Sequence, residues 1–436
     1  WFGRMNYTLL DRYMFTFTMR ADGSSRFNWL KTADNQQWGY FPSAAFAWRI
    51  NEEPFLRDVK AISDFKLRLG WGITGQQEGI GDYTYIPTYT PNQNSHALYP
   101  ILGDGKTYRP DAYNNQLTWE KTTTYNAGVD LSLLNDRLVF NLDWYYRKTK
   151  DLINDVYVSA GSNFSNIVKS NIGSLHNTGF EFATTVRPIV NKDWRWELTY
   201  NFTYNKNKID ELITGEGDDY YVETGGISGG TGLTIQGHHV GNATSAFYVY
   251  QQVYDGNGNP IPNTYVDRNG NGITDTGDRY FYYKPAPDVT MGLGSKLQYK
   301  NWDFSFSARA SLGNYVYNNV LSGMQNVGAG AIYTLGYLQN RSTDAVKQGF
   351  TNPLTNQLLS DYYVQNASFL KLDNITLGYS FGNLLGAKIS GRVYATVQNV
   401  FTITNYDGLD PEVSSGIDNN FYPRPFQTIL GLNLNF

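Results

Sequence analysis

The stretch Phe426–Phe436, FQTILGLNLNF, alternates between larger apolar and mostly polar residues up to its last position. In an extended strand, one face would carry Phe426, Thr428, Leu430, Leu432, Leu434 and Phe436, and the other Gln427, Ile429, Gly431, Asn433 and Asn435. Such a pattern allows two interpretations. It is either a half-buried strand of a soluble sandwich or a membrane strand with one face in lipid.

The composition favours the membrane interpretation. Aromatic residues make up 16% of the 436 residues, and charged residues only 17%, against roughly 25% charged in an ordinary soluble domain. No stretch approaches the ~18–20 consecutive apolar residues of a membrane helix. Many aromatics without a long apolar run are typical of an outer-membrane β-barrel, in which only alternate residues of each strand contact lipid.

Cysteine content and net charge exclude other classes. The chain has no cysteine, so disulfides and thiolate metal or redox sites are excluded. A formal net charge of −4 gives no reason to propose nucleic acid as a partner.

The same two-residue period recurs along the chain and predicts about thirteen strands. We expect them near residues 1–9, 12–23, 38–50, 64–75, 119–133, 137–148, 179–189, 194–205, 288–300, 301–313, 369–381, 388–402 and 426–436. The fold class is therefore all-β, a transmembrane antiparallel up-and-down barrel, with residues 1–436 forming part of one such barrel.

Short and long connections alternate between these strands. Long connections cover residues 22–37, 76–116, 150–178, 209–287, 315–368 and 403–424. Outer-membrane barrels have short periplasmic turns and long extracellular loops. Trp194, Trp196 and Trp302 lie beside short turns, where an interfacial aromatic girdle is expected.

The longest loop contains a candidate Ca²⁺ site, DRNGNGITDTGD, Asp267–Asp278. Positions 1, 3, 5, 7, 9 and 12 of an EF-hand-type loop would be Asp267, Asn269, Asn271, Ile273, Asp275 and Asp278. Oxygen ligands at these positions can surround Ca²⁺, with Gly272 allowing the sharp turn. Position 12 is Asp instead of the usual bidentate Glu, and a metal-free Asn/Gly/Asp turn is the equally weighted alternative.

Aromatic residues in the long loops are candidate ligand contacts. Tyr83, Tyr85 and Tyr89 lie in one loop, and Tyr220 and Tyr221 in another. They could stack on sugar rings or hold a peptide, although packing of the loops on one another explains any single one of them more simply. We find no nucleophile–base arrangement at a recognisable spacing, so we do not expect an enzyme.

Several longer segments resemble the SusC/RagA family of TonB-dependent outer-membrane transporters. They are RADGSSRF (20–27), WGYFPSAAFAWRINEEPFL (38–56), FKLRLGWGITGQQ (65–77), WEKTTTYNAGVDLSLLNDRLVFNLDWYYRKTKDLI (119–153), NIGSLHNTGFEF (171–182), VDRNGNGITDTGDRY (266–280), LKLDNITLGYSF (370–381) and the stretch 397–436. The resemblance covers nearly the whole chain. The family commonly has an acidic residue where Asn271 stands, which lowers the expected Ca²⁺ affinity.

The resemblance implies a 22-stranded barrel closed by an N-terminal plug, in the outer membrane of a Gram-negative bacterium. It implies a SusD-like lipoprotein as partner and import of oligosaccharides, or in some members peptides, driven by TonB–ExbB–ExbD. We expect the plug, the TonB box and about nine strands to lie outside this chain, and glycans to be the ligand. A peptide importer, a passive porin and a surface receptor remain alternatives. Phe436 resembles the C-terminal aromatic signal for barrel assembly.

Overall fold

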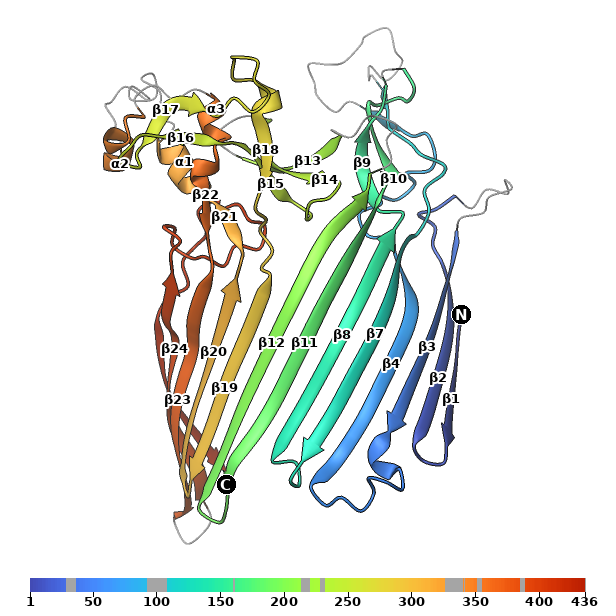
Figure 1. The fold of residues 1–436 in the computed structure, drawn as a ribbon, viewed down its shortest axis with the longest axis vertical. Coiled ribbons are helices and arrows are strands. Elements are labelled where there is room, and N and C mark those ends of the chain that lie inside the picture. Colours follow the sequence, from blue (N-terminus) through green and yellow to red (C-terminus); the bar gives the residue numbers. More distant parts are fainter. Residues whose placement is uncertain are drawn as a thin grey trace.

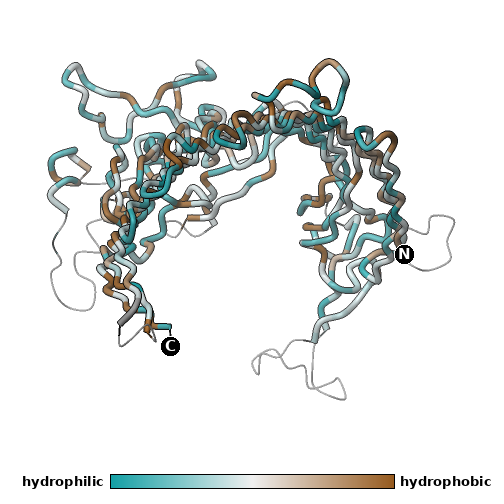
Figure 2. Tube along the Cα trace, turned by 90° about the horizontal axis from the view of Figure 1, so that it is seen from below, coloured by the Kyte–Doolittle hydropathy of each residue, from teal (hydrophilic) through white to brown (hydrophobic). Residues whose placement is uncertain are grey.

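Thirteen antiparallel strands form one continuous sheet in the computed structural model (Figure 1). The structure describes residues 1–28, 37–91, 108–159, 161–212, 220–227, 232–325, 340, 342–350, 355–384 and 389–435. Figure 2 shows the sheet as an arch viewed nearly along its strands. The two edge strands, β1 and β25, lie at opposite ends of the strand order. The predicted number of strands and the all-β class are confirmed.

Each strand of the sheet pairs with its neighbour in the chain order. In this order, the strands are β1 (Phe2–Leu9), β2 (Tyr13–Gly23), β3 (Trp38–Arg49), β4 (Ile62–Gln76), β7 (Glu120–Leu133), β8 (Leu138–Lys150), β11 (Ser174–Val190), β12 (Trp194–Glu211), β19 (Val289–Tyr299), β20 (Trp302–Leu312), β23 (Phe369–Leu384), β24 (Ile389–Thr404) and β25 (Gln427–Asn435). Side chains alternate between an apolar and a polar face. Outer-membrane barrels face lipid with the apolar side, so we assign the polar side to the inside of the arch.

Short turns join the strands at one end, which we call the turn end. Leu10 and Asp11 between β1 and β2 have φ of 52° and 54°, and Asn135 and Asp136 between β7 and β8 have φ of 54° and 61°. Such left-handed backbone matches the twist of tight hairpins and favours Asn and Asp. This local chemistry explains why the turns occur where the sequence predicts them.

Aromatic rings gather beside the short turns. The rings of Trp194 and Tyr299 lie 4.2 Å apart, and those of Trp302 and Tyr379 lie 4.8 Å apart. Trp196 donates its indole hydrogen to Ser295 at 3.1 Å. These contacts agree with the interfacial girdle predicted at this end of the strands.

Long connections carry the remaining elements at the other end, the loop end (Figure 1). The strands there are β5 (Tyr89–Pro91), β6 (Tyr108–Pro110), β9 (Ile153–Tyr157), β10 (Ile167–Asn171), β13 (Tyr221–Gly226), β14 (Thr234–His239), β15 (Ala246–Tyr250), β16 (Gln252–Tyr254), β17 (Pro260–Tyr265), β18 (Arg279–Tyr282), β21 (Tyr315–Tyr317) and β22 (Val364–Asn366). The helices are α1 (Asn319–Gln325), α2 (Thr343–Lys347) and α3 (Thr355–Leu358). Short 3-10 helices cover Ile50–Glu52 at the turn end and Thr276–Asp278 and Asp361–Tyr363 at the loop end. None of the helices in the described ranges is long and apolar enough to cross a bilayer.

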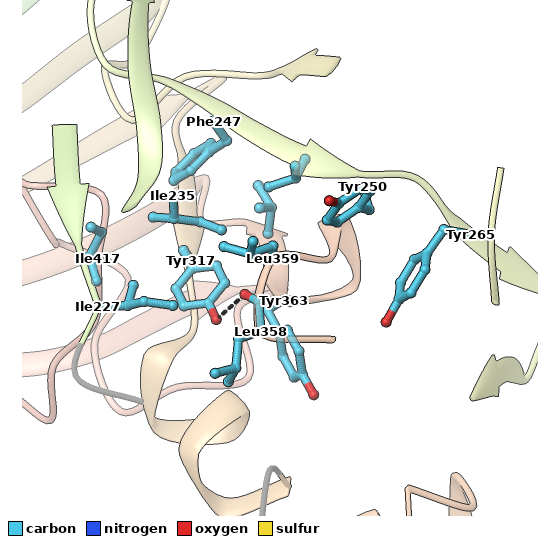
Figure 3. Packing of buried hydrophobic residues seen from close by; sticks show 12 residues of the cluster. Ile227, Ile235, Phe247, Tyr250, Tyr265, Tyr317, Leu358, Leu359, Tyr363 and Ile417 are labelled. Carbon is cyan, nitrogen blue, oxygen red and sulfur yellow. Dashed lines mark hydrogen bonds between the residues drawn. The ribbon is translucent and has the colours of Figure 1, made fainter. Parts of the chain in front are cut away.

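The last three long loops fold together around one hydrophobic core, shown in Figure 3. Its buried residues are Ile227, Ile235, Phe247, Val249, Tyr250, Tyr265, Tyr317, Leu358, Leu359, Tyr363, Val364 and Ile417. The hydroxyl of Tyr317 donates to the carbonyl of Leu358 at 2.7 Å, which satisfies a buried polar group. We call this unit the loop domain; it holds the loops in one arrangement above the sheet.

Candidate functional site

Arginines on the polar face of the sheet are paired with carboxylates from neighbouring strands. Arg68 on β4 donates to Asp130 on β7 and Asp143 on β8 over 2.8–2.9 Å. Arg392 on β24 lies 2.5 Å from Asp303 on β20. Bidentate pairs of this kind fix side-chain positions. The paired arginines therefore leave the inner wall polar without exposing much unbalanced charge at these positions.

Six charged side chains gather where β20 and β23 meet the loop end, and we call them the rim cluster: Arg309, Lys371, Asp373, Asp410, Glu412 and Arg424. Lys371, only 2% exposed, lies 2.7 Å from Asp410 and 3.2 Å from Glu412. Arg309 and Arg424 also donate to Glu412. Since Asp410 and Glu412 belong to the loop between β24 and β25, the cluster anchors that loop to the sheet.

A β-bulge positions the third carboxylate of the rim cluster, that of Asp373. The register between β20 and β23 shifts at Ser307/Ala308, so that Asp373 has no partner in the ladder. Bulges redirect side chains, and Asp373 accepts from Arg309 Nε at 2.9 and 3.0 Å. Partial burial raises the pKa of Glu412, but hydrogen bonds from Arg309 and Lys371 outweigh this effect and lower that pKa to about 2.

The three predicted tyrosines of the long connection 76–116 differ in their exposure. Tyr83 is 61% exposed and Tyr89 59% exposed, whereas Tyr85 is only 4% exposed. The ring of Tyr89 lies 6.2 Å from that of Phe164, which belongs to the next long loop. Tyr85 therefore packs inside its loop and does not present its ring to a ligand in this arrangement.

Tyr220 and Tyr221 separate into two different environments. Tyr220 packs against the buried Val156, Ile172 and Val222. The ring of Tyr221 lies 4.6 Å from that of Tyr248, and burial raises its pKa. Adjacent residues of an extended segment point to opposite sides, so the two rings do not form a single stacking platform.

The loop Asp267–Asp278 is closed by hydrogen bonds from its own backbone. Asp267 accepts from the amides of Gly270, Asn271 and Gly272 over 2.7–3.2 Å. Asp278 is fully buried and accepts from the amides of Arg268, Asn269 and Asp275 over 2.8–3.2 Å. These hydrogen bonds lower the pKa of Asp278, and the one from the backbone amide of Asp275 contributes most. Asp278 therefore joins the two ends of the loop.

Side chains at the middle of this loop converge on Asp275. The amide nitrogens of Asn269 and Asn271 lie 3.0 and 2.7 Å from its two carboxylate oxygens. If the side-chain amides of Asn269 and Asn271 rotated by half a turn, each would direct its oxygen instead of its nitrogen toward Asp275. A cation bound there requires oxygen ligands. Within the described residues, no three His, Cys, Asp or Glu side chains are grouped as metal ligands. The donor set thus fits Ca²⁺ only in part, and the Ca²⁺ site stays a prediction.

The structure also contains a hollow at the loop end that the sequence analysis did not identify. It has a volume of about 670 Å³ and lies between the end of β12 and the connection from β18 to β19. Tyr204, Lys206, Lys208, Tyr283, Lys284 and Tyr315 are among its lining residues. The rings of Tyr283 and Tyr315 stack 3.7 Å apart at 5°. Only the sequence YFYYK at 280–284 hinted at an aromatic cluster here. The remaining predicted residue, Phe436, lies outside the described residues.

Comparisons with known proteins relate the whole chain to one family. Residues 1–400 match the family model described as TonB dependent receptor-like, beta-barrel. The chain is 55% identical over its full length to the TonB-dependent receptor SusC of Bacteroides thetaiotaomicron, covering 43% of that protein. It is 31% identical to the TonB-dependent receptor P3 of Formosa agariphila, covering 45% of it.

A solved structure of the RagAB peptide transporter superposes on all of this chain with a TM-score of 0.80 and 25% identity, over 47% of the matched chain. The chain spans about half the length of the relatives it matches. The resemblance found in the sequence is thus confirmed. The chain belongs to the TonB-dependent receptor-like β-barrel family, is of the SusC/RagA type within it, and is an outer-membrane protein.

Proposed function

We propose that the protein containing this chain imports nutrient oligomers across the outer membrane, with energy from TonB–ExbB–ExbD and with a SusD-like lipoprotein as partner. The observation that carries the proposal is the 55% identity, over every residue of the chain, with a protein named as a TonB-dependent receptor. The polar inner wall, with arginines such as Arg68 held in ion pairs, supports a water-filled or plug-filled interior.

Glycans are the proposed ligand class, and oligopeptides the alternative. The chain is more similar to SusC, at 55% identity, than to the RagAB peptide transporter, at 25%. Exposed Tyr83 and Tyr89 offer rings that can stack on sugars. Arg309 and Arg392 already bind carboxylates of the chain itself, so they offer little charge to the termini of a peptide.

An uptake experiment tests both parts of the proposal. Cells that carry the full-length protein, its deletion, or a TonB deletion would be given fluorescent oligosaccharides and fluorescent oligopeptides of similar size. We expect oligosaccharide uptake that requires both the protein and TonB. Uptake that requires the protein but not TonB would indicate a passive porin. Surface binding without uptake would indicate a receptor, and uptake of peptides alone would support the alternative ligand class.

A separate pull-down tests the partner. The mature protein, solubilised in mild detergent, should bring down a SusD-like lipoprotein in near-stoichiometric amount. Its absence, while the barrel itself remains folded, would contradict a permanently paired lid.

A further inference from the structure

Five lysines lie on the lipid-facing side of the sheet, at the extracellular end of three of the four adjacent strands β7, β8, β11 and β12. We call them the lysine belt: Lys121 on β7, Lys148 and Lys150 on β8, and Lys206 and Lys208 on β12. The side of the sheet on which they lie follows from strand register, because residues directly opposite each other in an antiparallel pair point to the same face.

Strand register connects the belt into one row. Lys121 lies opposite Lys150, and His176 on β11 lies opposite both Lys148 and Lys208. Lys206 lies opposite Thr178. The row therefore runs without interruption across β7, β8, β11 and β12.

An aromatic row lies directly below the belt, further toward the membrane. Tyr125 follows Lys121 on β7, and Phe180 on β11 lies opposite both Trp144 on β8 and Tyr204 on β12. These four rings are 36–48% exposed. Exposed aromatic rings at the end of an apolar strand face mark the interface between hydrocarbon and headgroups. The belt thus lies at the height of the outer-leaflet headgroups.

The positive charge of the belt is largely uncompensated by the residues that the structure describes. Asp210 accepts from His176 at 2.7 Å and lies 3.8 Å from Lys148. The other four lysines have no ion pair with any residue in the described ranges, and all four are exposed. Like charges directly opposite on a sheet are destabilising, as for Lys121 and Lys150, so an external anion at this place would relieve repulsion.

Other strands of the same sheet show that the belt is local. Corresponding outward positions near the same end of β20, β23 and β24 carry the apolar Leu312, Leu370 and Ile403, which are 40%, 43% and 61% exposed. A uniform need for solubility at the rim does not explain why lysines occupy only β7, β8 and β12. Beside the belt, the 670 Å³ hollow offers Lys206 and Lys208 together with the ring of Tyr283. Lys284 also lines it but is paired with Asp288 at 2.6 Å.

We propose that the lysine belt and the adjoining hollow bind the phosphate-bearing headgroup of an outer-leaflet lipid. The ammonium groups would neutralise the phosphate, while the aromatic row contacts the upper acyl region and the hollow accepts the rest of the headgroup. This proposal rests on the outer-membrane location of the chain and not on the transported ligand. It therefore stands or falls separately from the proposed import function.

The test compares two full-length variants with the same loss of charge. The belt variant is K150Q/K206Q/K208Q. The control variant, K60Q/K192Q/K300Q, removes three exposed lysines at the turn end that have no ion pair with described residues. Both variants and the wild type are reconstituted in phosphatidylcholine nanodiscs that contain either lipid A or phosphatidylethanolamine, which has no net charge. Native mass spectrometry then counts the lipid molecules that stay bound when each protein is released from its nanodisc.

We expect the wild type and the control variant to retain lipid A in preference to phosphatidylethanolamine. In the belt variant this preference should be about tenfold weaker, since each lysine near an anionic surface adds to the binding free energy. Equal retention by the belt variant would overturn the proposal. So would displacement of lipid A by millimolar inorganic phosphate, which would indicate a site for free anions. If the belt variant does not insert, K206Q/K208Q is measured in its place and must show at least half of the effect on a logarithmic scale.

Discussion

The ammonium of Lys371 lies 2.7 Å from the carboxylate of Asp410, and this contact joins the sheet to the loop between β24 and β25. The side chain of Lys371 is only 3% exposed and that of Asp410 16% exposed. A pair that is this well shielded from water depends on both partners, because the loss of one leaves a buried charge.

Lys371→Ala is expected to release this loop. Removing one partner of a buried ion pair costs ~3–5 kcal/mol, and Asp410 and Glu412 would both lose a donor. Hydrogen–deuterium exchange should increase over residues 405–426 while the strands stay protected. Lys192→Ala, at an exposed turn position, serves as the control; unchanged exchange in K371A would show that the loop is held by other contacts.

The same anchor should resist mild acid. The folded-state pKa of Glu412, about 2, lies below the ordinary value of about 4.3 for Glu. A carboxylate with a depressed pKa stabilises the fold above its unfolded pKa, and this contribution is lost as the pH falls from about 4 through about 2. A nitroxide attached at the exposed Ser414→Cys should remain immobile at pH 5 and become mobile near pH 2. Release already at pH 5 would contradict the role of Glu412.

A Ca²⁺ titration tests the predicted metal site in the loop Asp267–Asp278. We expect a Ca²⁺ titration of the full-length protein to give a binding signal that D267N/D275N abolishes, because these two carboxylates lie on the exposed part of the loop. Mg²⁺ should bind more weakly, since it prefers a rigid octahedron with bound water. An identical signal from wild type and D267N/D275N would place any Ca²⁺ elsewhere.

Asp278 should matter whether or not the loop binds metal. Asp278→Ala leaves three backbone amides without their acceptor, and each unsatisfied buried donor costs ~1–3 kcal/mol. We expect faster amide exchange in residues 267–278 of D278A and no change in Asp193→Ala, an exposed aspartate of a short turn. Protection that is equal in both variants would refute the closing role of Asp278.

Deletion of Phe436 tests the proposed assembly signal. We expect less membrane-inserted protein with unchanged synthesis, measured as heat-modifiable barrel relative to total antigen. Phe436→Tyr, which keeps an aromatic ring at this position, should insert normally. Normal insertion of the deletion would show that the signal lies elsewhere.

Much of the sheet could be predicted because its signals are local. The alternation at Phe426–Phe436 and at Trp194–Asn205 requires only neighbouring residues to be recognised. Turn residues such as Asn135 and Asp136 adopt the left-handed backbone that their short polar side chains favour. Loop lengths then set which end of each strand carries the large loops, and the observed order β1 to β25 follows from antiparallel neighbours.

The loops could not be predicted in the same way, because their contacts join residues far apart in the chain. Nothing near Tyr85 in the sequence shows that it is buried while Tyr83 and Tyr89 are exposed. Tyr317 packs with Phe247 and Ile417 only when three loops meet in the loop domain. Burial in such a core depends on the partners and not on the residue type.

By itself, the amino-acid sequence determined the strands, their two faces and the family of the chain, because a two-residue period and short turn motifs act over a few residues. Only the tertiary structure decided that Lys371 pairs with Asp410 and that Tyr220 and Tyr221 lie in different environments. It also decided that lysines from β7, β8 and β12 form one belt. These relations arise from register between strands and packing between loops, where residues distant in sequence become neighbours in space.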